Sequence, residues 1–76
     1  MNLFLPDGPL AEARAAREAT VNAMAADLVR FEAFHTTSDA VRALMGRYPP
    51  IQIALLADDA RQVAMQSVVA REMMKP

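Results

Sequence analysis

Residues 46–59, "GRYPPIQIALLADD", decide the fold, because the alternation in "PIQIAL" suits a buried strand and the whole run also suits the start of a helix. A strand needs a partner, and no second segment of the chain alternates with a period of two. The residue before a proline is biased toward extended angles, and proline suits the first position of a helix. We therefore predict a helix over 50–74, with Tyr48 and Pro49 extended before it.

The segment 10–34 is rich in strong helix formers and contains no glycine or proline. This composition predicts a helix over 9–34. An apolar tip and a turn precede it over 1–8, where Asp7 is suited to cap the helix amides. The two long helices frame a single small domain, 1–76.

A short helix over 38–46 is predicted between them. Thr36, Thr37 and Ser38 are all candidate N-caps, and Thr36 with Asp39 three places later resembles a capping box. Gly46 suits the left-handed position that ends a helix. This helix is expected to bury Val41, Leu44 and Met45.

Apolar residues spaced three and four apart predict the core. Arg14 and Arg17 interrupt the pattern, so the first half of helix 9–34 is expected to be less buried than the second. The predicted core residues are Val21, Met24, Leu28, Phe31, Leu44, Ile53, Leu56, Ala60 and Val63.

The helix over 50–74 carries a second apolar stripe, although a helix in a monomeric hairpin needs only one. An excess of exposed apolar surface usually marks an interface, and flexible methionines suit such a surface. Leu3 and Phe4 in the N-terminal tip have the same character. The predicted partner-binding residues are Ile51, Leu55, Met65, Val69, Met73, Leu3 and Phe4.

The expected architecture is all-α, with two long antiparallel helices joined by a short helix. Because a two-helix hairpin leaves apolar faces uncovered, we expect a homodimer that completes a helical bundle, or an obligate complex with another protein. The leading functional hypothesis is a small non-enzymatic interaction module, an adaptor, regulator or inhibitor that covers a surface on a partner.

Composition narrows the function classes. The chain has no cysteine, which excludes disulfides and thiolate metal sites, and a net charge of −1, which disfavours nucleic-acid and anionic-membrane partners. The start "MNLFLPDGP" lacks a cationic region, and no apolar run reaches membrane length. Abundant arginine and alanine are typical of GC-rich bacterial or phage genomes. We expect a soluble cytoplasmic protein with no cofactor and no small-molecule substrate.

Two alternatives stay open. The short helix, the turn "GRYP" and the next helix have helix-turn-helix proportions, but only Gln52 is placed to read a base edge and only Arg47 is cationic nearby. Glu32 and His35, one helical turn apart, resemble the ligand pair of metal-binding bundles. The chain has no second motif of this kind to supply the other metal ligands. Asp58 and Arg61, three residues apart on the helix over 50–74, are expected to form a surface ion pair.

Overall fold

The structure, a computed structural model, describes residues 8–75. Within them no strand joins a sheet, and the only strand-like pairing is an isolated bridge between Met45 and Tyr48. The prediction of an all-α fold is confirmed. The chain forms three helices in the order α1 (Pro9–Arg30), α2 (Thr37–Leu44) and α3 (Pro50–Met73).

The first helix begins as predicted and ends earlier than predicted. Pro9 occupies the first turn of α1, and Gly8 is the N-cap, without a side-chain capping bond. The missing amide of a proline at this position sacrifices no helical hydrogen bond. Asp7, the predicted cap, lies outside the described residues.

The end of α1 at Arg30, rather than at residue 34, has a local cause. Glu32 adopts a left-handed φ of 52°. Its amide donates to the carbonyl of Val29 at 3.2 Å, and the amide of Ala33 donates to the carbonyl of Leu28 at 2.8 Å. These two bonds form a Schellman motif, which closes a helix and usually has glycine where Glu32 stands.

The start and end of α2 follow the predicted signals. The Thr36 side chain accepts a hydrogen bond from the amide of Asp39 at 3.1 Å, which confirms the N-cap. Gly46 has a φ of +84°, so the left-handed position is also confirmed. The helix begins at Thr37, one residue before the predicted start, and ends at Leu44, two residues before the predicted end.

The double proline starts α3 as predicted. Pro49 is extended, with φ −61° and ψ 142°, and Pro50 is the first helical residue. Tyr48 ties this turn to α1, because its hydroxyl donates to Asp27 Oδ2 at 2.7 Å. Burial raises the pKa of the Tyr48 phenol, and the bond to the Asp27 carboxylate raises it further.

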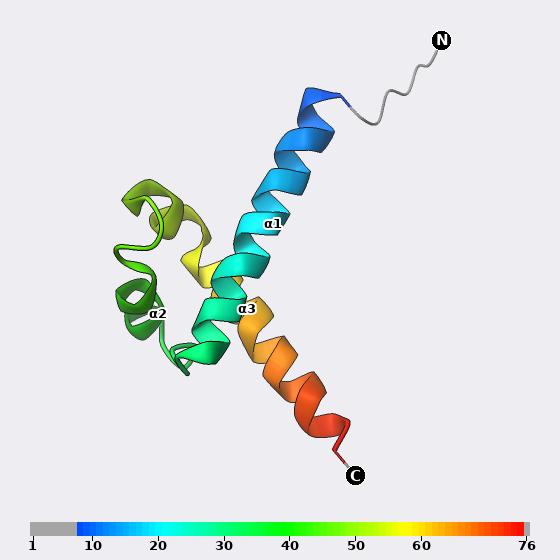
Figure 1. Cartoon of the computed structure of the whole chain (residues 1–76), viewed down its shortest axis with the longest axis vertical. Helices are drawn as coiled ribbons and strands as arrows, with labels where there is room; N and C mark the ends of the chain where they lie inside the picture. The colour runs from blue at the N-terminus through cyan, green and yellow to red at the C-terminus, as the bar shows by residue number, and fades with distance from the viewer. Residues whose placement is uncertain (1–7, 76) are drawn as a thin grey trace.

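The two long helices cross and run in the same direction, so the antiparallel prediction is wrong (Figure 1). Ala16 of α1 lines one groove with Leu55 of α3, and Val29 lines another with Ser67, so positions advance together along both helices. The cause is the connector, residues 31–49. It contains α2 and is long enough to carry the chain back toward the end where α1 begins.

The core lies where the three helices meet. Every buried residue of the described chain is apolar, and half of them are alanine, so the helix backbones can approach closely at the crossing. The buried residues are Val21, Met24, Ala25, Leu28, Ala33, Ala40, Leu44, Ile53, Leu56, Ala57, Ala60 and Ala64.

Four residues expected to be buried are less covered than predicted. Phe31 is 43% exposed because α1 has already ended, and Met45 is 64% exposed because α2 ends at Leu44 and Met45 is extended. Val41 and Val63 pack against the core but are only partly buried. Phe31 and Met45, which follow the last residues of α1 and α2, are therefore less covered than a continuous helical stripe predicts.

The crossing gives the molecule a flat outline. The Cα atoms span 48 × 37 × 14 Å, and their radius of gyration is 14.9 Å, against about 11 Å for a compact chain of this length. In Figure 1 the first half of α1 and the last part of α3 project away from the crossing on opposite sides. Neither the stretch 9–19 nor the stretch 65–73 contains a buried residue.

Candidate interaction surface

The outward face of α3 carries an exposed apolar stripe, which we call the α3 stripe. Its members are spaced so that they lie opposite the buried face of α3, which contains Ile53, Ala60 and Ala64. At 1.5 Å per residue the stripe is about 33 Å long. The residues and their exposed fractions are Ile51 70%, Leu55 71%, Met65 42%, Val69 55% and Met73 80%.

Polar residues interrupt the middle of the α3 stripe. Asp58 and Gln62 lie between Leu55 and Met65, and both are exposed. The Asp58 side chain is 63% exposed although it accepts a long hydrogen bond, 3.4 Å, from the hydroxyl of Thr37. The surface therefore has two apolar ends and a polar centre.

An ion pair borders the α3 stripe on the side of α1. Arg17 Nη2 donates to Asp59 Oδ2, and the two side chains are about half exposed, at 57% and 47%. The pair joins α1 to α3 near the crossing and neutralises the carboxylate beside the stripe. Its contribution to stability is small because solvent screens it.

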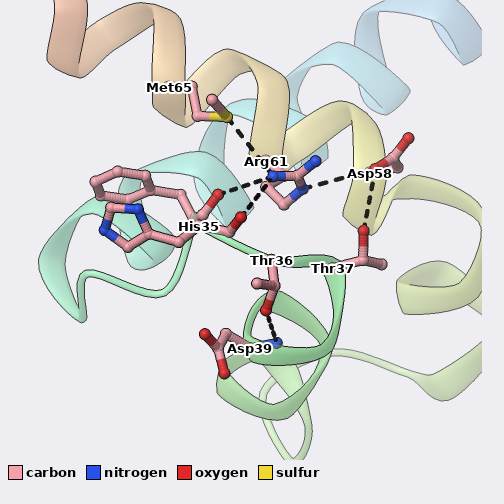
Figure 2. A network of polar contacts seen from close by, with 8 residues as sticks. His35, Thr36, Thr37, Asp39, Asp58, Arg61 and Met65 are labelled. Carbon is pink, nitrogen blue, oxygen red and sulfur yellow. Dashed lines mark hydrogen bonds and ion pairs between the residues drawn. The ribbon is translucent and has the colours of Figure 1, made fainter.

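Arg61 is a structural link that sequence reasoning underestimated (Figure 2). Its Nη1 donates to the carbonyls of Phe34 and His35, both at 3.1 Å, and lies 3.7 Å from the sulfur of Met65. Its Nε lies 3.7 Å from Asp58 Oδ1, which confirms the predicted ion pair. The guanidinium thus ties the connector to α3, and no pattern near Arg61 in the sequence indicates these carbonyl contacts.

A second apolar feature lies between α2 and the start of α3. This groove has a volume of about 720 Å³ and is lined by Val41, Met45, Tyr48, Pro50 and Ile53, among others. The sequence pattern does not indicate this groove, because it predicts Met45 to be buried. Met45, which lines the groove, is 64% exposed.

The proposed Glu32 and His35 metal pair does not have the expected geometry. Glu32 is left-handed and follows the end of α1, so the two residues are not one turn apart on a helix. The His35 ring instead stacks at a tilt on Phe34, with centroids 4.5 Å apart. Within residues 8–75 no three potential His, Cys, Asp or Glu ligands gather at one point.

The segment with helix-turn-helix proportions exposes mainly apolar side chains at the start of α3. Ile51 and Leu55 are the prominent ones, and Gln52 is half-buried. The nearby cation, Arg47, lies over the Phe31 ring, 4.6 Å from its centroid, with Arg30 at 5.4 Å. Arg47 is therefore already in a cation–π contact in this structure.

Leu3 and Phe4, the remaining predicted contact residues, lie outside the described part of the chain. No helix within residues 8–75 has both the length and the apolar content needed to cross a membrane. Comparison of the chain with protein families, with curated proteins and with solved structures found no match.

Proposed function

We propose that this protein is a small non-enzymatic interaction module that acts by covering a surface on a protein partner, with the α3 stripe as the contact. The observation that carries the proposal is the exposure of four apolar side chains at 55% or more on one helix face, at Ile51, Leu55, Val69 and Met73. Burying such side chains against a partner releases water from apolar surface, which is the main driving force of association.

The shape of the molecule supports the same conclusion. The stripe lies on a flat molecule whose Cα atoms span only 14 Å in the thinnest direction. In Figure 1 α1 passes in front of α3 at the crossing, and among the described residues Ile51, Leu55 and Val69 on the outer side of α3 stay exposed. A surface of this kind is accessible along its length to a helix or a sheet of another protein.

The partner in this proposal is a protein, either a second copy or another chain, and no cofactor or small-molecule substrate is required. Methionine at Met65 and Met73 suits the role, because flexible thioethers repack against the shape that they meet. We place the protein in the cytoplasm, since a chain without cysteine is compatible with a reducing compartment.

The test compares the wild type with Leu55→Asp/Val69→Asp, which puts a charge in each apolar end of the stripe. Each protein is examined by sedimentation velocity and used as bait in an extract of its source cells. We expect the wild type to self-associate or to retain a specific protein, and the double variant to do neither while keeping its circular dichroism spectrum.

Leu10→Asp is the matched control, because Leu10 is also apolar and 75% exposed but lies on α1, outside the stripe. It should behave like the wild type. A double variant that associates as well as the wild type would show that the stripe is not the contact. A wild type that neither self-associates nor retains a protein would refute the proposed function.

A further inference from the structure

We propose that the partner of the α3 stripe is a second copy of this chain, docked antiparallel along α3 with a two-fold axis beside position 60. This inference rests on the proposed function and specifies its partner and its register. The order of the residues along the outer face of α3 and the exposure of each one support this pairing.

Six outward residues of α3, from Ile51 to Val69 and without Met73, follow a coiled-coil seam. From Ile51 they recur at intervals of four, three, four, three and four residues, which is the alternation of a and d positions in a heptad repeat. Such a seam buries its side chains against another helix that carries the same repeat. In order, the residues are Ile51, Leu55, Asp58, Gln62, Met65 and Val69.

This seam is symmetric about its centre. Read from either end, it has two apolar residues, two polar residues and two apolar residues, and each residue has a counterpart at the same distance from position 60. Two-fold symmetric dimers require such self-complementarity, since residue i contacts residue j and j contacts i. An antiparallel pair of α3 helices meets this requirement along the whole seam.

The contacts in this register match in chemistry. Ile51 lies opposite Val69 of the second copy, and Leu55 lies opposite Met65 of the second copy, so apolar groups meet only apolar groups. Asp58 lies opposite Gln62 of the second copy. The amide nitrogen of a glutamine donates and a carboxylate accepts, so this polar layer can form one hydrogen bond on each side of the axis.

Parallel pairing is disfavoured by the same residues. In a parallel, in-register dimer each residue meets its own copy, which places the Asp58 carboxylates of both chains together in the seam. Like charges in such a position repel and select against that arrangement. The polar layer therefore sets both the direction and the register of the pair, as a polar residue in a coiled-coil core commonly does.

The structure leaves room for this arrangement. The Asp58 side chain is 63% exposed although it already contacts Arg61 and Thr37. Asp59, which borders the seam near the axis, carries the ion pair with Arg17, so the carboxylates of the two copies are neutralised there. The seam from 51 to 69 is about 27 Å long.

The direction of pairing is tested with single-cysteine variants of the full chain, because the natural sequence has no cysteine. Leu55→Cys and Met65→Cys proteins, one of them carrying a size tag, are mixed and oxidised. We expect the mixed disulfide dimer to form at least several-fold faster than either homodimer. Ala13→Cys, on the exposed first half of α1, is the control and should cross-link slowly with both.

Parallel pairing would instead give rapid homodimers of Leu55→Cys, and that result would overturn the proposal. Sedimentation equilibrium of the wild type, from about 1 to about 500 µM to cover the range expected of a small interface, gives the second test. We expect a monomer–dimer equilibrium, and Asp58→Ala/Gln62→Leu should increase the share of dimers but also allow parallel cross-links.

The failure of this inference is distinguishable from that of the proposed function. A wild type that stays monomeric over the whole range but retains a specific protein through Leu55 and Val69 would overturn the self-pairing and leave the interaction module standing. A wild type that stays monomeric and retains nothing would overturn both.

Discussion

Arg61→Met tests whether one guanidinium holds the connector onto α3. Methionine keeps much of the apolar stem of arginine and removes all its donors, so the carbonyls of Phe34 and His35 lose their side-chain partner. A hydrogen bond from a charged donor contributes about 1.5–3 kcal/mol. Both bonds share one nitrogen and His35 is exposed, so we expect a combined loss of about 2 kcal/mol.

The assay is urea unfolding followed by circular dichroism at 222 nm, with all variants at one protein concentration. A chain of this size has an m-value of about 1 kcal/mol/M, so the midpoint should fall by about 2 M. Arg61→Lys, which retains a charge but not the forked donor, should lie between the wild type and Arg61→Met. Arg14→Met, on the exposed half of α1, should change the free energy of unfolding by less than about 0.5 kcal/mol. If Arg61→Met is as stable as Arg14→Met, the guanidinium does not hold the connector.

Three further changes test other parts of the fold. The pKa of Tyr48 is raised above its usual 10.0 in the folded state, so the contribution of the phenol to the free energy of unfolding is full below pH 10 and is lost as the pH rises through the folded pKa. Absorbance at 295 nm reports the ionisation of this residue alone, since the chain has one tyrosine and no tryptophan. Tyr48→Phe should abolish that part of the alkaline destabilisation. Glu32→Gly relieves the strain of the left-handed backbone and should raise the free energy of unfolding by about 0.5–1 kcal/mol. The control, Glu18→Gly inside α1, should lower it by about 1 kcal/mol. If urea unfolding shows that Glu32→Gly is less stable than the wild type, α1 does not end in a Schellman motif at Glu32. Leu44→Ala empties a fully buried position and should lower the free energy of unfolding by about 3 kcal/mol, and a loss below about 1 kcal/mol in the same assay would show that Leu44 is not in a packed core.

The sequence was sufficient to predict a helix start or end where the residue that causes it lies within a few positions of it. Thr36 caps the helix that starts beside it, Gly46 ends it, and Pro50 opens the next. Each of these residues acts through its own backbone angles or through an amide three positions away. Their effects hardly depend on the rest of the fold.

The end of α1 and the direction of α3 could not be predicted in this way. Glutamate rarely takes the left-handed position that closes a Schellman motif, so Glu32 gives no stop signal, and the helical composition continues through Phe34. The early stop exposes Phe31 and lengthens the connector. A longer connector permits the return path that makes α1 and α3 run in the same direction, which helical periodicity alone does not encode.

In the candidate site, too, the features set by local sequence could be predicted and those set by distant contacts could not. Periodicity was enough to predict that Ile51, Leu55 and Val69 point away from the buried face of α3, because a helix fixes the angle between its residues. The contacts of Arg61 with the connector join positions more than 25 apart in the chain. Nothing in the local sequence specifies such contacts, since they depend on how the helices cross. That α3 binds a partner through this face stays a prediction.

The crossing also links association to the folding of α3 itself. From Met65 to Met73 the helix has no buried residue and therefore little tertiary support. Isolated helices shorter than roughly 12–15 residues are marginally stable in water, because helix nucleation is unfavourable and most helical stability in proteins comes from tertiary packing. Residues 65–73 extend a helix whose earlier turns are already held by packing on the core. These residues therefore need no nucleation of their own, but they gain few apolar contacts. A partner on the α3 stripe would supply those contacts at Met65 and Val69, so binding and ordering of this segment should stabilise each other.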